Sequence, residues 1–173
     1  MLQKNKLNIM KLFFEEPYRN FQIREVSRLS KIAVTSVKKY LEELSGEKLI
    51  IKDKKTLYPS YVANSQSRLF KVYKQHFIIL NLYSSGLIDY LEDTLHPRCI
   101  ILFGSVRKGE YDKQSDIDIF IQSNKKSVNL TKFENNLKHK VSLFFEPDID
   151  KLSNELFNNI INGIKLSGYI KLK

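Results

Sequence analysis

The segment between residues 98 and 121 constrains the fold most strongly. Residues 98–103 (RCIILF) form a short apolar run rich in β-formers, which predicts a buried strand. Gly104-Ser105 follows at once, and the stretch SDIDIFI at 115–121 then alternates polar and apolar residues. Because side chains alternate sides along a strand, Asp116 and Asp118 are expected to share one face and their isoleucine neighbours the other.

Two carboxylates about 7 Å apart on one sheet face repel each other unless something neutralises them. Oxygen ligands of this kind suit Mg²⁺ or Mn²⁺, so we predict that Asp116 and Asp118 are catalytic carboxylates that bind a metal ion. Gly104 lets the backbone approach a phosphate, and Ser105 with the N–H groups of the next helix can hold a triphosphate. The pattern therefore favours phosphoryl chemistry, in which a hydroxyl displaces pyrophosphate.

The residues GSVRKGEYDKQSDIDIFI at 104–121 resemble the signature of the nucleotidyltransferase superfamily, and more closely that of the minimal nucleotidyltransferases of prokaryotes. The later stretch NNIINGIKLSGYI is similar to that family's closing helix and terminal segment, so the resemblance covers residues 98–173. It implies transfer of a nucleoside monophosphate, expected to be AMP from ATP, to a hydroxyl. In related systems the acceptor is often a tyrosine of a HEPN-type toxin. The positions that the resemblance assigns to nucleotide binding are Gly104, Ser105, Lys108, Gly109 and Ser115.

Two departures from the family pattern leave catalysis open. The loop carries Arg107 and Lys108 where the family has a small residue and an arginine. The resemblance also implies a third carboxylate on the next strand, expected at residues 140–145, but the alternation there brings Ser142 to that position. Glu146 has the same parity but lies about 13 Å farther along a strand. Loss of a general base costs ~10²–10⁴ in rate, so the alternative is a domain that senses nucleotide or supports dimerisation.

Positive charge is concentrated in the first part of the chain. Residues 1–75 hold 16 Lys and Arg against 7 Asp and Glu, a balance of +9. Residues 76–173 hold 13 against 12, a balance of +1. Such an asymmetry is typical of a nucleic-acid-binding part joined to a part with another role.

Apolar spacing in the basic part predicts helices at residues 5–14, 23–29 and 33–45, with a short break at 30–32 and a stop at Gly46. A hairpin is expected next, from strands at 49–51 and 57–62 with a polar tip at 52–55. The stretch from Ile23 to Ile50 resembles the winged helix-turn-helix regulators. Lys31 stands where their turn glycine is typical and Ala33 where a Ser or Thr cap is typical, and both replacements should cost some stability.

This resemblance implies binding of double-stranded DNA, with the third helix in the major groove and the hairpin tip on phosphates. The alternative is a protein-binding winged helix whose basic surface is only solvated. The residues expected to contact DNA are Val34, Thr35, Ser36, Lys38, Lys39, Lys52, Lys54 and Lys55.

The whole chain is predicted to be an α+β protein with three parts. A winged helix-turn-helix domain is expected at residues 1–63, a helical connector at 64–96, and a small mixed-sheet nucleotidyltransferase domain at 97–173. A homodimer formed through the connector is compatible with the sequence, and a transferase acting on RNA ranks lower. The single Cys99, the lack of a secretory signal and the lack of a long apolar run favour a cytoplasmic protein that does not enter a membrane.

Overall fold

A computed structural model describes residues 3–53 and 58–170 of the chain. It divides into two compact units, residues 1–74 and 75–173. The division falls inside one helix, α4 (Arg68–Ser84), so the stretch that was expected to connect two domains contributes to both units. None of the helices in the described part is long and apolar enough to cross a membrane.

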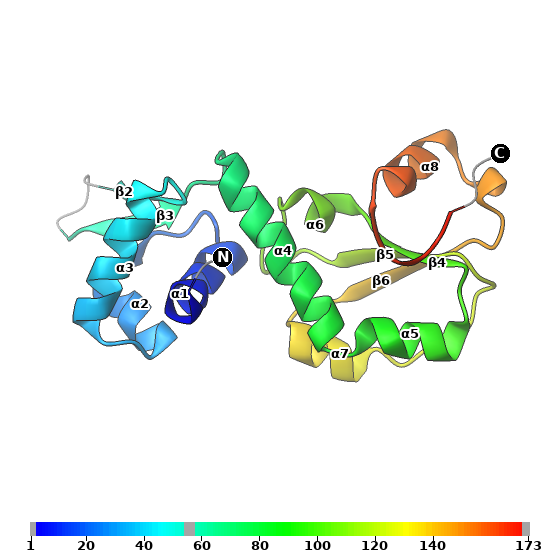
Figure 1. Cartoon of the computed structure of the whole chain (residues 1–173), viewed down its shortest axis with the longest axis horizontal. Coiled ribbons are helices and arrows are strands. Elements are labelled where there is room, and N and C mark those ends of the chain that lie inside the picture. Colours follow the sequence, from blue (N-terminus) through cyan, green and yellow to red (C-terminus); the bar gives the residue numbers. More distant parts are fainter. Residues whose placement is uncertain (1–2, 54–57, 171–173) are drawn as a thin grey trace. The chain divides into compact units, whose positions relative to one another are not determined.

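The first unit combines three helices with a small antiparallel sheet (Figure 1). In the sheet the order is β1-β3-β2, and β3 pairs with both neighbours. The core is built from apolar side chains of all three helices, including Phe13, Val26 and Leu41. The elements run in the order α1 (Lys4–Glu15), β1 (Phe21–Gln22), α2 (Ile23–Ser30), α3 (Val34–Gly46), β2 (Ile50–Asp53) and β3 (Ser60–Ala63).

The helices and the hairpin expected from the sequence are present, with shifted ends. Gly46 is the last residue of α3 rather than the residue beyond it, and the left-handed turn comes at Lys48, with φ +57°. The second hairpin strand begins at Ser60, because Tyr58 and Pro59 lie outside the ladder. Lys54 and Lys55, expected at the tip, fall outside the described residues.

The break between α2 and α3 has the two features expected to weaken it. Lys31 adopts the left-handed conformation, with φ +57° and ψ +33°. In this conformation a residue with a Cβ atom is less stable than glycine. Ala33 caps α3 without a side-chain hydrogen bond. The hydroxyl of Ser27 compensates in part, because it donates to the Ile32 carbonyl at 2.6 Å and closes the turn.

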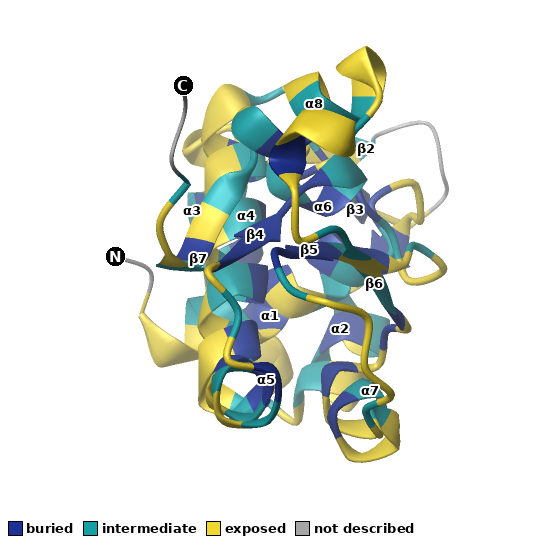
Figure 2. Ribbon diagram, turned by 90° about the vertical axis from the view of Figure 1, so that its right-hand side faces the viewer, coloured by how far each residue is buried: buried dark blue, intermediate teal, exposed yellow. Residues whose placement is uncertain are grey.

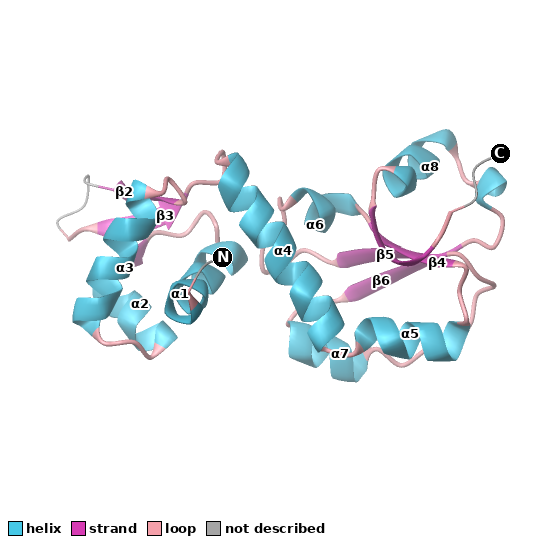
Figure 3. Ribbon diagram, viewed as in Figure 1, coloured by secondary structure: helices cyan, strands magenta, loops and turns pink. Residues whose placement is uncertain are grey.

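The second unit is a four-stranded mixed sheet in the order β6-β5-β4-β7. Only β5 and β6 are parallel, and α7 connects them; the other pairs are antiparallel. Figure 3 shows helices on both sides of this sheet. The elements after α4 are α5 (Leu87–Leu95), β4 (Cys99–Leu102), α6 (Gly104–Lys108), β5 (Ile117–Ile121), α7 (Thr131–Leu137), β6 (Val141–Phe145), a 3₁₀ turn (Ile149–Lys151), α8 (Asn154–Ile161) and β7 (Ile164–Gly168).

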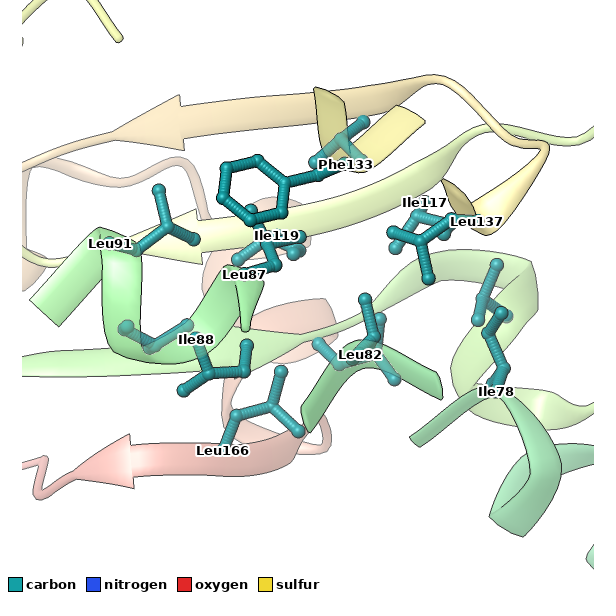
Figure 4. Packing of buried hydrophobic residues seen from close by; sticks show 14 of the residues in the cluster. Ile78, Leu82, Leu87, Ile88, Leu91, Ile117, Ile119, Phe133, Leu137 and Leu166 are labelled. Carbon is teal, nitrogen blue, oxygen red and sulfur yellow. The ribbon is translucent and has the colours of Figure 1, made fainter. Parts of the chain in front are cut away.

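The two faces of this sheet are buried to different depths. One face packs against α4, α5 and α7, where Leu82, Leu91 and Phe133 meet Ile117 and Ile119 (Figure 4). The other face packs against α8 through a smaller cluster around Phe103, Phe120 and Ile160. Figure 2 shows the inner strands β4 and β5 as mostly buried and the outer surface of α8 as exposed. The smaller cluster leaves part of this second face open, and that is where the acidic residues lie.

Candidate functional site

Gly104 and Asp118 lie against each other at one end of the sheet. Gly104 follows β4, and Asp118 is the second residue of β5, which pairs with β4. The N–H of Phe103 donates to the Asp118 carbonyl at 3.1 Å, which fixes the register of the two segments. Gly104 has φ +72°, and a Cβ atom built on it would stand 2.3 Å from Asp118 Oδ2. Only glycine fits this position without displacing the carboxylate.

The two acidic side chains predicted to share a face influence each other electrostatically. Asp116 is exposed and lies just before β5, whereas Asp118 is half-buried. Burial raises the pKa of the Asp118 carboxyl above its ordinary value, and the negative charge of Asp116 raises it further. Among the described residues neither carboxylate forms an ion pair. The structure therefore brings together two carboxylates that form no ion pair with a basic side chain of the described residues.

The donor set at this position is small. Within residues 3–53 and 58–170, no group of three or more His, Cys, Asp or Glu side chains is arranged to hold a metal ion. Mg²⁺ is usually bound through one or two carboxylates together with waters and substrate phosphates rather than by a complete protein cage. Asp116 and Asp118 fit that kind of site.

The turn before Asp116 is held by a network of hydrogen bonds. The Ser115 hydroxyl accepts from the Asp112 N–H at 3.0 Å and donates to Asp112 Oδ1 at 3.1 Å. The same Asp112 oxygen accepts from the Gln114 N–H at 2.9 Å. Ser115 was expected to bind nucleotide, but its hydroxyl forms part of this turn and positions the next residue, Asp116.

A buried histidine fixes the other side of the turn. His139 Nδ1 lies 2.9 Å from the Ser115 carbonyl oxygen, so this nitrogen carries the proton and donates. The ring is 4% exposed and packs edge-to-face against Tyr111, with ring centroids 5.6 Å apart. The backbone that leads into Asp116 is therefore held from two directions.

The loop predicted to hold phosphates forms one short helix, α6, directly after β4. Ser105 in its first turn is partly exposed, and Lys108 at its end is exposed. Gly109 ends the helix in the left-handed conformation, with φ +68°, and its N–H donates to the Val106 carbonyl at 3.0 Å. Gly109 is buried, so it serves to turn the chain, while Ser105 and Lys108 remain open to solvent.

The position expected to hold a third carboxylate is occupied by Ser142. In the parallel pair β5–β6, Asp118 is in register with Ser142 and Phe120 with Phe144. The prediction that Ser142 lies beside the acidic pair is confirmed. Glu146 lies beyond the end of β6, and its carboxylate accepts from the Asp148 N–H at 3.0 Å.

Most of the residues predicted to contact DNA are exposed in the first unit. Val34, Thr35, Lys38 and Lys39 are exposed on α3, and Ser36 is partly exposed. Lys39 lies 4.0 Å from Glu43, an exposed pair that holds it only weakly. Lys52 is exposed on β2.

Sequence reasoning missed Asp112 and His139. Asp112 bonds to the Ser115 hydroxyl and His139 to the Ser115 carbonyl, so both position Asp116 through Ser115. His139 is 24 residues from Ser115 in sequence. The Asp-x-x-Ser spacing is the signal that could have identified the turn, since Asp and Ser side chains often bond to nearby backbone. No sequence pattern indicates the histidine.

Comparisons with known proteins bear on the second unit. A search among curated proteins gave no match to the chain. Residues 86–168, however, match the family model described as "Polymerase beta, Nucleotidyltransferase", so the second unit contains a nucleotidyltransferase-like domain.

Proposed function

We propose that the second unit binds a nucleoside triphosphate with Mg²⁺ and transfers its nucleoside monophosphate, AMP from ATP, to a protein hydroxyl. The observation that carries this proposal is the contact between Gly104 and Asp118. It aligns the loop proposed to hold phosphates with a carboxylate that no basic side chain of the described residues neutralises. The family match over residues 86–168 supports the same class of chemistry.

In this proposal the chain positions the reactants and contributes charge. The Gly104 backbone allows close approach of the phosphates, and the Ser105 hydroxyl and the Lys108 ammonium group bind their oxygens. Asp116 and Asp118 would hold the metal ion, which supplies positive charge to the phosphates during displacement of pyrophosphate. His139 and Asp112 keep Asp116 in place through the turn at Ser115.

Label position in ATP distinguishes nucleotidyl transfer from phosphoryl transfer. The full chain is incubated with Mg²⁺, a candidate HEPN-type toxin, and ATP labelled at the α- or the γ-phosphate. We expect acid-stable label on the acceptor from α-labelled ATP only, and none with the Asp116→Asn/Asp118→Asn variant. Label from γ-labelled ATP would replace this proposal with a kinase-type reaction.

A second candidate function is nucleotide sensing without transfer, and Ser142 is the observation that favours it. A serine in register with Asp118 cannot act as a carboxylate base toward an incoming hydroxyl. Magnesium-dependent ATP binding with no label on any acceptor offered would favour the sensing function.

For the first unit we propose a winged helix-turn-helix domain that binds double-stranded DNA. Supporting this are the element order from α1 to β3, the excess of positive charge in residues 1–75, and the exposed Thr35, Lys38 and Lys39 on α3. A helix of this kind fits the major groove, and lysines bind phosphates in a salt-dependent way.

The DNA proposal is tested with a matched pair of charge-removal variants. Binding of labelled genomic fragments is measured by anisotropy at several salt concentrations. Lys38→Ala/Lys39→Ala should weaken binding and lower the salt slope by about 2. Lys4→Ala/Lys11→Ala removes the same charge from exposed positions of α1 and should change binding much less. Equal effects of the two variants would count against α3 as the reading helix.

A further inference from the structure

An aromatic side chain is exposed on the sheet face that carries Asp118. Phe144 lies on β6, two residues beyond Ser142, and 43% of its surface is exposed. Its strand neighbour Phe120 is fully buried within the cluster that packs against α8. The cluster that packs against α8 therefore covers Phe120 and leaves Phe144 partly exposed on the same face.

This ring is held in place by a second aromatic side chain. Phe144 packs edge-to-face against Phe103, with centroids 5.3 Å apart and planes at 72°. Phe103 is 6% exposed and directly precedes Gly104. The Phe103 N–H also donates to the Asp118 carbonyl, so the ring pair is fixed in place next to the phosphate loop and the strand that carries the carboxylate.

The distance between Asp118 and Phe144 suits the two ends of one nucleotide. Strand rise and spacing place the backbone of Phe144 roughly 8 Å from that of Asp118. Phosphates bound at Gly104, and held near Asp118 through the metal ion, would leave the base of the same molecule above this part of the sheet. An uncharged flat ring is the surface on which a base of any kind can stack.

We propose that Phe144, supported by Phe103, is the stacking platform for the base of the bound nucleotide. This inference rests on the proposed binding of a nucleoside triphosphate. It assigns to this face a subsite that recognises the base by its flat surface, separate from the groups that recognise phosphates.

Comparison of ATP with inorganic tripolyphosphate isolates the contribution of the base. Both ligands are titrated with Mg²⁺ into the full chain and into Phe144→Leu and Phe144→Tyr. Phe144→Leu should weaken ATP binding about tenfold and leave tripolyphosphate binding unchanged, because leucine keeps apolar volume but offers no ring. Phe144→Tyr should bind ATP like the parent.

The chain contains no tryptophan, so Phe144→Trp introduces a single fluorophore at the platform. ATP should quench its fluorescence, and tripolyphosphate should not. Tyr169→Trp is the matched control, since Tyr169 is 62% exposed and lies beside the opposite end of β4. Its fluorescence should not respond to either ligand.

The outcomes separate this inference from the function on which it rests. Suppose that the parent binds ATP. If Phe144→Leu binds ATP as well as the parent does, or if it loses affinity for ATP and tripolyphosphate to the same extent, the platform is overturned and the proposed function stands. If the parent binds neither ligand, both are overturned. An equal response of the two tryptophan variants to ATP would also overturn the platform.

Discussion

The Asp118 carboxylate lies in direct contact with the backbone of Gly104, where a Cβ atom would come within 2.3 Å of Asp118 Oδ2. This contact joins the end of one strand to the beginning of its antiparallel neighbour. It places a carboxylate beside the loop that is proposed to hold phosphates. Four predictions depend on this site and on the break between α2 and α3.

Gly104→Ala should weaken magnesium-dependent ATP binding at least tenfold in calorimetry. The new methyl group displaces the Asp118 carboxylate, and the positive φ adds a strain of about 1–2 kcal/mol. Gly86→Ala is the matched control, because Gly86 has φ +77° and open space around its α-carbon. It should lower stability similarly and leave ATP affinity unchanged. Equal ATP affinity in Gly104→Ala would contradict the assigned role of the contact.

Ser142→Asp should make stability depend on magnesium. A third carboxylate in register with Asp118 adds repulsion to a pair that already lacks a basic partner in the described residues. We expect a lower melting temperature in chelator and a larger increase on addition of Mg²⁺ than in the parent. Ser142→Asn, similar in size but neutral, should show neither change. If the melting temperature of Ser142→Asp does not change on addition of Mg²⁺, position 142 does not face the metal site.

Removing the His139 hydrogen bond should weaken metal binding without removing a metal ligand. In His139→Leu the Ser115 carbonyl loses its donor, and the Mn²⁺ affinity measured by calorimetry should fall about tenfold. His139→Asn keeps an N–H near the position of Nδ1 and should recover most of the affinity. Leu137→Ala, a buried change on α7, controls for general destabilisation. If Leu137→Ala lowers Mn²⁺ affinity as much as His139→Leu does, the histidine has only a packing role.

Ala33→Ser should stabilise the first unit by about 1 kcal/mol, because a serine at the N-cap can accept from the free N–H groups in the first turn of α3. The direct measurement is amide hydrogen exchange at Thr35 and Ser36, which should slow relative to the parent. Ala33→Val, which offers no acceptor, should not slow it. Unchanged exchange in Ala33→Ser would mean that α3 begins elsewhere.

Local sequence patterns were sufficient to predict most of the helices and strands. The spacing of Val37, Leu41 and Leu44 predicted α3, and all three are fully buried. The alternation of polar and apolar residues predicted β5 and the position of Ser142 beside Asp118. A strand that buries one face pairs in a defined register, because a shift by one residue would move its apolar side chains to the other face. The left-handed Lys31 and the uncapped Ala33 were expected from the resemblance of this stretch to winged helix-turn-helix regulators, which typically have a glycine and a Ser or Thr cap there.

The remaining features depend on contacts between distant segments. The contact of Gly104 with Asp118 requires the pairing of β4 with β5, and the ring pair of Phe103 and Phe144 reaches from the end of β4 to β6 across the intervening strand. His139 contacts Ser115 only because β6 lies parallel to β5. Periodicity carries no information on such pairs, so these groups emerged only from the structure.

We propose that Asp116 and Asp118 bind a nucleotide through a divalent cation. Calorimetric titration of ATP into the full chain, with Mg²⁺ and with chelator, tests it most directly when the Asp116→Asn/Asp118→Asn variant is run in parallel. We expect the parent to bind ATP with Mg²⁺ and not with chelator, and we expect the variant to bind under neither condition while it remains folded by circular dichroism. Binding of equal strength in chelator, equal binding by the variant, or no binding by the parent would contradict it.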